Sequence, residues 1–448
     1  MEKTFYIKTY GCQMNELDGS QMGRLLAKQG YLPVADPEAA SVILINTCSI
    51  REKASQKVYS DVGRFRSLKL KNPETVLAVT GCQAQAEGMH LQKRFPYLDL
   101  VVGPDHTARI PELVEKVRRE GGRHLAAVKL ERREDYQFLN LLPEEEEGAL
   151  KAFVTIMKGC DNFCSFCIVP FVRGREVCRD SEEIVREVAE LAERGTREVT
   201  LLGQNVNSYG VGRHAKDPNA VSFARLLRMV AERTAIRRLR FTTSHPKDLS
   251  DELIEEFRAN PKLASHFHLP VQSGSDAVLE RMYRGYDRAF YVERLAKLRA
   301  ARPDLAVSTD VIVGFPGETE ADFEATMDLL EELRYDSIYS FVYSARPKTT
   351  AALYFADDVV AEVKQERLRR LQDLQDRITY EKNAAQVGRR LEVLVEGPSK
   401  SGGTYYGRSS QNHVVHFAGS EDDVGHFLAL RIRHAGPNSL IGERDVGN

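Results

Sequence analysis

The sequence predicts an α/β protein in three parts: an N-terminal doubly wound parallel-sheet domain, a central partial (β/α)6 barrel and a C-terminal small antiparallel β-barrel. Short apolar runs alternate with helical stretches over residues 4–103, and the same rhythm returns over residues 152–352. From about Arg390 the pattern changes to short alternating runs separated by glycines. The expected boundaries are 3–119 for the first domain, 120–145 for a linker, 146–376 for the barrel and 379–446 for the last domain.

In the N-terminal domain a cysteine follows each of three strand patterns. The strands are expected at Phe5–Ile7, Val42–Ile45 and Val76–Val79. The cysteines are Cys12, Cys48 and Cys82. Ligands gather beyond the carboxyl ends of the strands in open α/β sheets, so parallel strands would bring these three thiols to one edge. The alternative is three unrelated small buried residues.

The central domain shows six further strand patterns separated by helical segments. These strands are expected at Phe153–Met157, Val199–Leu202, Leu239–Thr242, His266–Leu269, Val307–Val313 and Ser337–Val342. Six βα units indicate a full or partial parallel barrel, whose site lies at the C-terminal ends of its strands. A charged helical pattern over residues 361–383 then leads to the last domain.

The glycine-punctuated C-terminal segment indicates a small barrel of about five strands. It carries aromatic and basic side chains of the kind that bind RNA. They are Tyr405, Tyr406, Arg408, His413, His416, Phe417, Arg431, Arg433 and His434. Because the segment is close to neutral in formal charge, RNA binding and a purely structural cap stay open as alternatives.

Composition excludes some functional classes. The chain has 448 residues and a formal net charge of −2, so it is not a generally basic nucleic-acid-binding protein, and any RNA contact must come from local patches. No run approaches the ~18 apolar residues that span a bilayer, and residues 1–7 contain no apolar signal segment. We therefore expect a cytoplasmic, monomeric protein without membrane contact.

The most specific motif is a group of three cysteines within eight residues, Cys160, Cys164 and Cys167. A structural zinc site normally takes four ligands, whereas an iron–sulfur cube held by three cysteines keeps one iron open for another ligand. The group follows the first barrel strand, where a barrel enzyme places its site. Gly159 before it allows the backbone to turn tightly. Zinc remains the alternative metal.

This C-x-x-x-C-x-x-C spacing resembles the radical S-adenosylmethionine (radical SAM) superfamily. The resemblance implies a [4Fe–4S] cluster on these cysteines, with S-adenosyl-L-methionine chelated at its open iron. It also implies cofactor binding by two segments that follow barrel strands. The first, expected near the methionine moiety, comprises Gly203, Gln204 and Asn205. The second, expected near adenine, comprises Gly314, Phe315 and Pro316.

The N-terminal cysteines, in Tyr10–Asn15, Asn46–Arg51 and Thr80–Cys82, look like those of the methylthiotransferase family. That resemblance spans essentially the whole chain. It implies a second [4Fe–4S] cluster, which carries or delivers sulfur, and a C-terminal TRAM domain that binds RNA. Expected partners are tRNA, an electron donor such as flavodoxin or ferredoxin, and a sulfur donor.

Within the family, five segments read most like the branch that acts on N(6)-dimethylallyladenosine in tRNA. They are Tyr10–Asn15, Asn46–Lys53, Glu198–Tyr209, Phe241–Asp248 and Leu269–Ser275. The implied reaction is sulfur insertion and methyl transfer at C2 of that nucleoside at position 37, beside the anticodon. The alternatives are a methylthiotransferase for another modified adenosine or for ribosomal protein, and a non-catalytic cluster-containing RNA-binding protein.

Several other residues are weaker candidates, each with a purely structural alternative. Arg173 and Arg175 could contact phosphate or the cofactor carboxylate. The candidates for substrate or cofactor contact after barrel strands are His245, Gln272, Ser273 and Ser275. The basic run Arg237, Arg238 and Arg240 could contact the tRNA backbone. Cys178 stands where the family usually has serine, and we interpret it as a small substituted residue.

Overall fold

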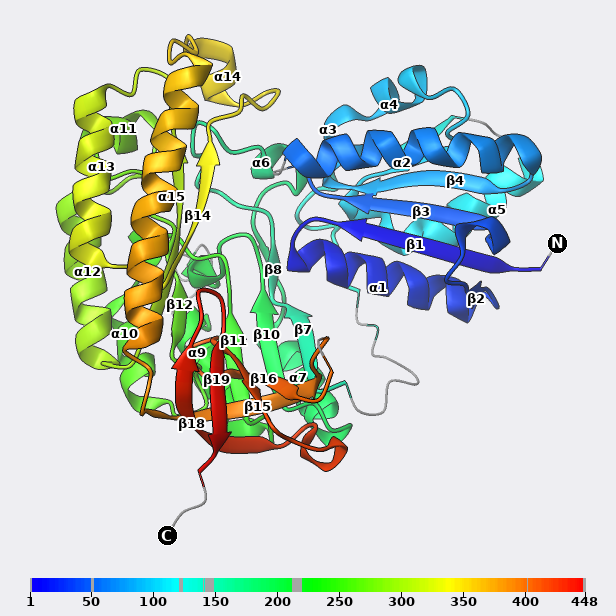
Figure 1. Ribbon diagram of the computed structural model, residues 1–448. Coiled ribbons are helices and arrows are strands. Elements are labelled where there is room, and N and C mark those ends of the chain that lie inside the picture. The colour runs from blue at the N-terminus through cyan, green and yellow to red at the C-terminus, as the bar shows by residue number, and fades with distance from the viewer. Residues whose placement is uncertain are drawn as a thin grey trace.

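The computed structural model describes residues 2–49, 52–120, 124–139, 141, 149–211, 220–400 and 402–445. Three units follow one another along the chain, and Figure 1 shows the N-terminal sheet domain beside the large central domain, with the C-terminal barrel below it. Most of the segment expected to be a linker contacts the first two units, but its acidic run at residues 143–148 lies outside the described residues.

The first unit is a six-stranded sheet in which every neighbouring pair is parallel. In spatial order its strands are β2 (Leu32–Pro33), β1 (Thr4–Tyr10), β3 (Val42–Thr47), β4 (Val76–Gly81), β5 (Leu100–Val102) and β6 (Leu125–Ala127). The three strands predicted before cysteines lie within β1, β3 and β4. We did not predict β2, β5 or β6, because strands of two or three residues are too short to show a periodic pattern in the sequence.

Helices cover both faces of this sheet, so it is doubly wound as predicted. On one face lie α1 (Gln13–Lys28) and α5 (Ile110–Glu120), which share a core with the sheet through Leu26 and Val114. The other face carries α2 (Glu52–Lys71), α3 (Cys82–Glu87) and α4 (Met89–Arg94). The nearly all-buried strands β3 and β4 follow from this double cover, since parallel strands enclosed on both faces must be apolar throughout.

The central unit has the six predicted strands. They form two parallel three-stranded sheets, β7–β10–β11 and β12–β13–β14, and a bridge between Leu239 and Leu263 joins them. The bounds are β7 (Lys151–Thr155), β10 (Glu198–Leu202), β11 (Arg238–Phe241), β12 (His266–His268), β13 (Ala306–Val313) and β14 (Ser337–Val342). Two short strands, β8 (Met157–Lys158) and β9 (Val177–Cys178), pair with each other beside the first sheet. The arrangement is the expected partial barrel.

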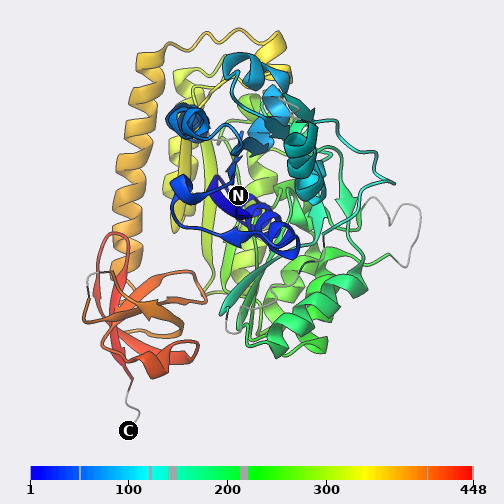
Figure 2. The ribbon, with the colours of Figure 1, turned by 90° about the vertical axis from the view of Figure 1, so that its right-hand side faces the viewer.

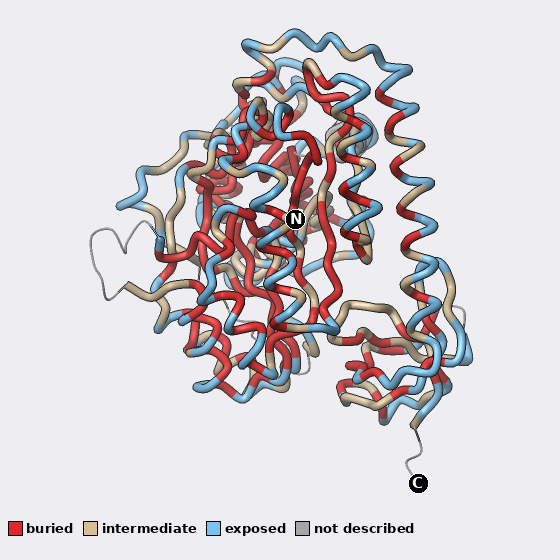
Figure 3. Tube along the Cα trace, turned by 90° about the vertical axis from the view of Figure 1, so that its left-hand side faces the viewer, coloured by how far each residue is buried: buried red, intermediate tan, exposed pale blue. Residues whose placement is uncertain are grey.

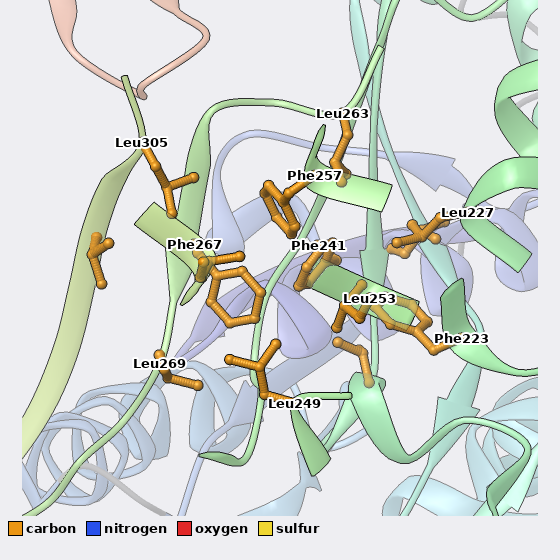
Figure 4. Close-up of a cluster of buried hydrophobic side chains, with 14 of the residues drawn as sticks. Phe223, Leu227, Phe241, Leu249, Leu253, Phe257, Leu263, Phe267, Leu269 and Leu305 are labelled. Carbon is orange, nitrogen blue, oxygen red and sulfur yellow. The ribbon is translucent and has the colours of Figure 1, made fainter. Parts of the chain in front are cut away.

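Helices form the outer layer of the partial barrel. The longer ones are α7 (Ser181–Glu193), α9 (Phe223–Arg233), α10 (Asp251–Ala259), α12 (Arg288–Ala301) and α13 (Glu320–Leu333). Short helices α6 (Val169–Val172), α11 (Asp276–Arg281) and α14 (Thr350–Tyr354) follow strand ends. Aromatic rings fill the space between strands and helices: Phe241 meets Phe267 edge to face at 5.2 Å, and Phe257 lies beside both (Figure 4). Figure 3 shows continuously buried segments in the interior, whereas the outer helices alternate between buried and exposed residues.

The long helix α15 (Ala361–Ala384) connects the partial barrel to the last unit and runs along one side of the molecule (Figure 2). The last unit is a closed five-stranded barrel in the order β15–β16–β17–β19–β18. Its strands are β15 (Arg390–Pro398), β16 (Tyr405–Ser409), β17 (Val414–Phe417), β18 (Phe427–Ala435) and β19 (Leu440–Arg444). We predicted an antiparallel barrel, but β17 and β19 pair in parallel and so close it.

Two arginines attach the small barrel to the central unit. Arg238 donates to the carbonyl of Arg408 at 3.0 Å, and Arg240 donates to that of Ser409 at 2.7 Å. Glu198 accepts hydrogen bonds from both arginine side chains. Burial raises the pKa of Glu198, but the charges of Arg240 and Arg238 lower it by more, so the net effect is a lowered pKa. The prediction that this basic run contacts tRNA is therefore wrong for Arg238 and Arg240, which are buried in the junction.

Candidate functional site

The three N-terminal cysteines meet at one edge of the first sheet. Strands β1, β3 and β4 are neighbours, and Tyr10, Thr47 and Gly81 lie in register across them. The thiols that follow these positions belong to Cys12, Cys48 and Cys82. Parallel pairing thus brings together three residues that are far apart in the sequence, as predicted from the strand pattern.

The turns beyond these strands leave little free space. Gly11 has a φ of 134°, and a Cβ added there would lie 2.5 Å from the Cβ of Cys48. Gly81 also has a positive φ, 87°. A hydrogen bond with Cys48 lowers the pKa of the Cys12 thiol to about 6, against the effect of burial and with help from the nearby Arg173 guanidinium. Glycine at both turns therefore allows the close approach of the thiols.

Arg173 reaches this triad from the central unit. Its Nε lies 3.2 Å from the Sγ of Cys82, and its Nη2 donates to Asp18 at 2.6 Å. Burial still raises the pKa of Cys82, with Arg173 opposing. The guanidinium is buried and contacts Cys82 and Asp18 of the first domain, and its contact with phosphate or the cofactor carboxylate stays a prediction. Sequence spacing carries no signal for a partner about 90 residues away.

The second triad lies in the loop after β8. The amide of Cys160 donates to Gly174 at 3.2 Å, and that of Cys167 donates to Cys164 at 2.9 Å. Gly159 has a φ of 77°, and a Cβ there would lie 2.1 Å from the carbonyl oxygen of Arg175, so only glycine fits. Burial raises the pKa of Cys160, and it raises that of Cys167 to about 12.

A buried arginine also contacts the second triad. Arg284 Nη1 lies 3.3 Å from the Sγ of Cys164, while its Nη2 donates to the Pro270 carbonyl at 2.9 Å. His245 Nε2 lies 3.9 Å from the same sulfur. Burial, with Arg284 nearby, lowers the pKa of His245, so it is neutral at pH 7. The site-facing position expected for His245 is observed, whereas the sequence analysis missed Arg284, which no motif marks.

Both triads fit an iron–sulfur cluster better than a single ion. Each offers three sulfur donors, which are the ligands such clusters take, and each lies largely out of solvent. A structural zinc site takes four ligands, whereas each triad offers three thiols, the number that leaves one iron of a cube open.

The two triads share one interdomain region. Ile168, the residue after Cys167, packs in one buried cluster with Cys82 and Val172. A buried ion pair ties the same two domains together: Lys158 Nζ lies 2.6 Å from Asp105, in the 3-10 helix Pro104–Arg109 of the first domain. The loop that carries the second triad therefore packs against the domain that carries the first.

The segment predicted to bind the methionine moiety follows β10. A Cβ on Gly203 would lie 2.5 Å from Met157 Cγ, so this position needs glycine. The side-chain oxygen of Gln204 accepts from the amide of Gly159, directly before the second triad. Asn205 donates to Asp248 at 2.8 Å, and its buried Oδ1 has no partner among the described residues. The segment thus reaches the cysteine loop, and its contact with cofactor stays a prediction.

The second predicted cofactor segment is a tight turn after β13. Gly314 has a φ of 68° and donates its amide to Glu318 at 2.6 Å. Phe315 is fully buried against Tyr343 and Phe166, so its side chain belongs to the core and only its backbone can meet a ligand. The carbonyl of Pro316 accepts from Arg281, which leaves the rest of the turn as the candidate contact.

Arg175 and Cys178 have structural surroundings. Arg175 pairs with Asp161 at 2.6 Å and covers the ring of Phe163, which is the surface pair we gave as its alternative. Cys178 is half-buried against the barrel core, and its sulfur accepts from the amide of Gly210 at 3.5 Å. Neither observation assigns substrate contact.

The polar residues after β12 divide into two kinds. Gln272 has a φ of 74°, and its buried Oε1 lacks a partner within the described structure, so it remains a candidate. Ser273 is completely buried with its hydroxyl 3.3 Å from that of Thr326, and Ser275 caps α11. Both serines have hydrogen-bond partners within the protein, and their contact with substrate or cofactor stays a prediction.

None of the helices in the described ranges has the length and apolar character that crossing a membrane requires.

Three family models match successive parts of the chain. Residues 4–103 match "Uncharacterized protein family UPF0004", residues 154–330 match the "Radical SAM superfamily" and residues 384–444 match the "TRAM domain". The chain is 49% identical over 444 residues to a tRNA-2-methylthio-N(6)-dimethylallyladenosine synthase of Syntrophotalea carbinolica, covering 99% of this chain and 100% of that protein. It is 51% identical over 445 residues to the enzyme of the same name from Myxococcus xanthus, covering 99% and 94%.

Solved structures with this arrangement are more distant in sequence. The radical S-adenosylmethionine methyltransferase TsrM from Kitasatospora setae superposes with a TM-score of 0.53 at 16% identity, over 79% of this chain and 77% of that one. The cobalamin-dependent S-adenosylmethionine radical enzyme OxsB gives 0.53 at 12% identity, over 82% and 56%. At these identities the likeness shows the fold alone.

Proposed function

The chain belongs to the family of tRNA-2-methylthio-N(6)-dimethylallyladenosine synthases, the MiaB-type radical SAM methylthiotransferases, and from this membership we propose how its residues divide the work. The enzyme methylthiolates N(6)-dimethylallyladenosine in tRNA. We assign one [4Fe–4S] cluster to each cysteine triad. We also propose that the modified nucleotide is at position 37, beside the anticodon. The observation that carries the proposal is the packing of Ile168, the residue after Cys167, against Cys82 of the first domain.

The second triad is the proposed site of S-adenosylmethionine cleavage. Cys160, Cys164 and Cys167 would hold three irons of a cluster and leave the fourth open for the cofactor. When bound, that cluster supplies the electron that cleaves the sulfonium. The loop lies at the C-terminal end of the barrel strands, where barrel enzymes place their chemistry. Gln204 orients the loop through Gly159, and Asn205 offers a free oxygen toward the cofactor.

The first triad is the proposed carrier of the sulfur. Cys12, Cys48 and Cys82 would hold the second cluster with one iron left for sulfur. Arg173 places a positive charge on Cys82 and is itself held by Asp18, so it fixes both the charge and the position of this triad relative to the barrel. Cys82, Arg173 and Ile168 at this junction are buried, whereas Cys12 stays partly exposed.

We also propose the partners. The TRAM barrel would contact tRNA through its aromatic and basic side chains, and an electron donor such as flavodoxin or ferredoxin and a separate sulfur donor would serve the clusters. A monomer in the cytoplasm remains our expectation.

An anaerobic assay of the reconstituted protein tests the proposal. The reaction contains S-adenosylmethionine, a strong reductant and tRNA carrying dimethylallyladenosine, and mass spectrometry follows digested nucleosides and deoxyadenosine. We expect the methylthio nucleoside together with deoxyadenosine. Formation of deoxyadenosine without modified nucleoside would contradict the assigned substrate. Absence of both products, with both clusters present, would contradict the assignment as an enzyme.

A further inference from the structure

One face of β14 presents aromatic rings to the inside of the partial barrel. Ile338 and Val342 pack on the main core, and Ser340 accepts a hydrogen bond from Gln372 of α15, so these residues face the helices. Side chains alternate along a strand, which turns Tyr339 and Phe341 to the opposite, inner face. Figure 1 shows α15 lying along the outer side of this strand.

Both inner rings are exposed although they line a barrel. Tyr339 is 51% exposed and Phe341 is 39% exposed, whereas the rings of Phe241, Phe267 and Phe315 in the same domain are buried. In the register of the sheet, Tyr339 lies beside Asp310 and Phe341 beside Ile312. Large apolar surface left open inside an otherwise packed barrel is typical of a ligand site.

Polar side chains border the ring of Tyr339. The ring of His268 meets that of Tyr339 at 5.8 Å, and its Nε2 lies 3.5 Å from Asp310. The side chain of Asp310 is 28% exposed, so its carboxylate can still accept a hydrogen bond from a ligand. The face therefore combines two open rings with one acceptor, a pattern that suits an apolar group attached to an N–H.

The aromatic face is continuous with the cofactor site. Ile312 packs with Phe166 and Phe315 in one small core, and Phe166 lies between Cys164 and Cys167. Ile312 is the partner of Phe341 on the neighbouring strand, so one residue separates Phe341 from Phe166 of the cysteine loop. Tyr339 lies two residues, or about 7 Å, deeper along the strand.

We propose that Tyr339 and Phe341 bind the dimethylallyl group of the substrate adenosine, while Asp310 accepts the hydrogen bond of its N6–H. This inference rests on the proposed function, which supplies the substrate. The group is branched and apolar, so its contact with two otherwise hydrated rings gains the hydrophobic stabilisation that unmodified adenosine lacks. Tyr339 and Phe341 are then the residues that make the enzyme select prenylated tRNA.

Binding of two anticodon stem–loops to the anaerobic holoenzyme tests the inference. One stem–loop carries dimethylallyladenosine and the other carries adenosine. Fluorescence anisotropy gives both Kd values, and the preference is the Kd of the unmodified stem–loop divided by the Kd of the modified one. In Tyr339→Ala and in Phe341→Ala we expect this ratio to fall by about 10-fold or more, with binding of the unmodified stem–loop unchanged. Phe290→Ala is the matched control, because Phe290 is 36% exposed on the outer helix α12, and it should leave the ratio unchanged.

Two further measurements keep the outcome clear. Phe341→Leu retains an apolar side chain and should retain most of the preference, and the cluster absorbance of every variant should equal that of the wild type. An unchanged ratio in both alanine variants would overturn the inference. A lower yield of deoxyadenosine from the alanine variants in the absence of tRNA would also overturn the inference. It would mean that this aromatic face binds the adenine of S-adenosylmethionine. If the wild type itself shows neither preference nor product, the proposed function fails instead.

Discussion

The two cysteine triads reach similar surroundings by different routes. In the first, three strands of one sheet each deliver one cysteine, and the positive charge on Cys82 comes from Arg173 of another domain. In the second, one loop of eight residues delivers all three, and the charge on Cys164 comes from Arg284 of the same domain. A distributed site depends on sheet register and domain packing, whereas a local site depends mainly on its own loop.

The thiols of the two triads also differ in their electrostatics. The pKa of Cys12 is lowered to about 6, chiefly by its hydrogen bond with Cys48. Burial raises that of Cys160 and raises that of Cys167 to about 12. Cluster assembly must therefore displace protons from the barrel loop, while the first triad already favours one thiolate.

Removing one cysteine from each triad should give the largest and clearest difference. We expect Cys164→Ala to abolish S-adenosylmethionine cleavage, and Cys48→Ala to abolish methylthio transfer while leaving some cleavage without tRNA modification. Each variant should retain about half of the wild-type iron, because the other cluster remains. Iron analysis and mass spectrometry of deoxyadenosine and nucleosides measure both effects. Full methylthiolation by either variant would contradict the division of roles.

Replacing the two buried arginines tests whether each serves only its own triad. Arg173→Met and Arg284→Met should each lower activity about 10–100-fold, as loss of groups beside metal ligands does. Each should also shift the reduction potential of one cluster to a more negative value, since a nearby positive charge favours the reduced form. Potentiometric EPR separates the two clusters.

Arg175→Met is the matched control for this pair, because Arg175 forms an exposed ion pair with Asp161. It should move neither potential. A shift of both clusters in Arg173→Met would mean that the arginine acts on the whole junction rather than on the first triad.

Breaking the buried pair between Lys158 and Asp105 probes the dependence of the distributed site on domain packing. The side chains are 5% and 1% exposed, so Lys158→Met leaves an unpaired buried carboxylate and should cost about 3–5 kcal/mol of stability. Denaturant unfolding measures this loss. Arg109→Met, which breaks an exposed pair with Glu112, should cost less than about 1 kcal/mol. Equal effects of the two changes would argue against a tight junction.

Cys178→Ser should have the smallest effect. The residue lies outside both triads, and serine preserves its size and its acceptor for Gly210. We expect unchanged iron content and activity and a stability change below about 1 kcal/mol. Loss of a cluster in this variant would show that Cys178 takes part in holding one.

Prediction from the sequence succeeded where the signal is local. The strands before Cys12, Cys48 and Cys82 and the six barrel strands follow from apolar periodicity, and the glycines of the turns mark where thiols approach. It missed β2, β5 and β6, which are too short to show periodicity, and the parallel pairing that closes the small barrel. It carried no signal for the internal hydrogen bonds of Ser273 and Ser275, whose partners are set by the tertiary structure.

By itself the sequence determined the fold class, the second triad and the family resemblance, because strand periods and the spacing of Cys160, Cys164 and Cys167 are properties of neighbouring residues. The first triad also required the parallel pairing of three strands. Only the tertiary structure decided the partners of the charged side chains. Arg173 contacts Cys82, Arg284 contacts Cys164, and Arg238 docks the small barrel. An arginine's partner depends on which element packs against it, and a long side chain reaches that partner across any separation in the sequence. Tertiary packing likewise left the side chains of Tyr339 and Phe341 exposed, although their apolar rings alone would predict burial.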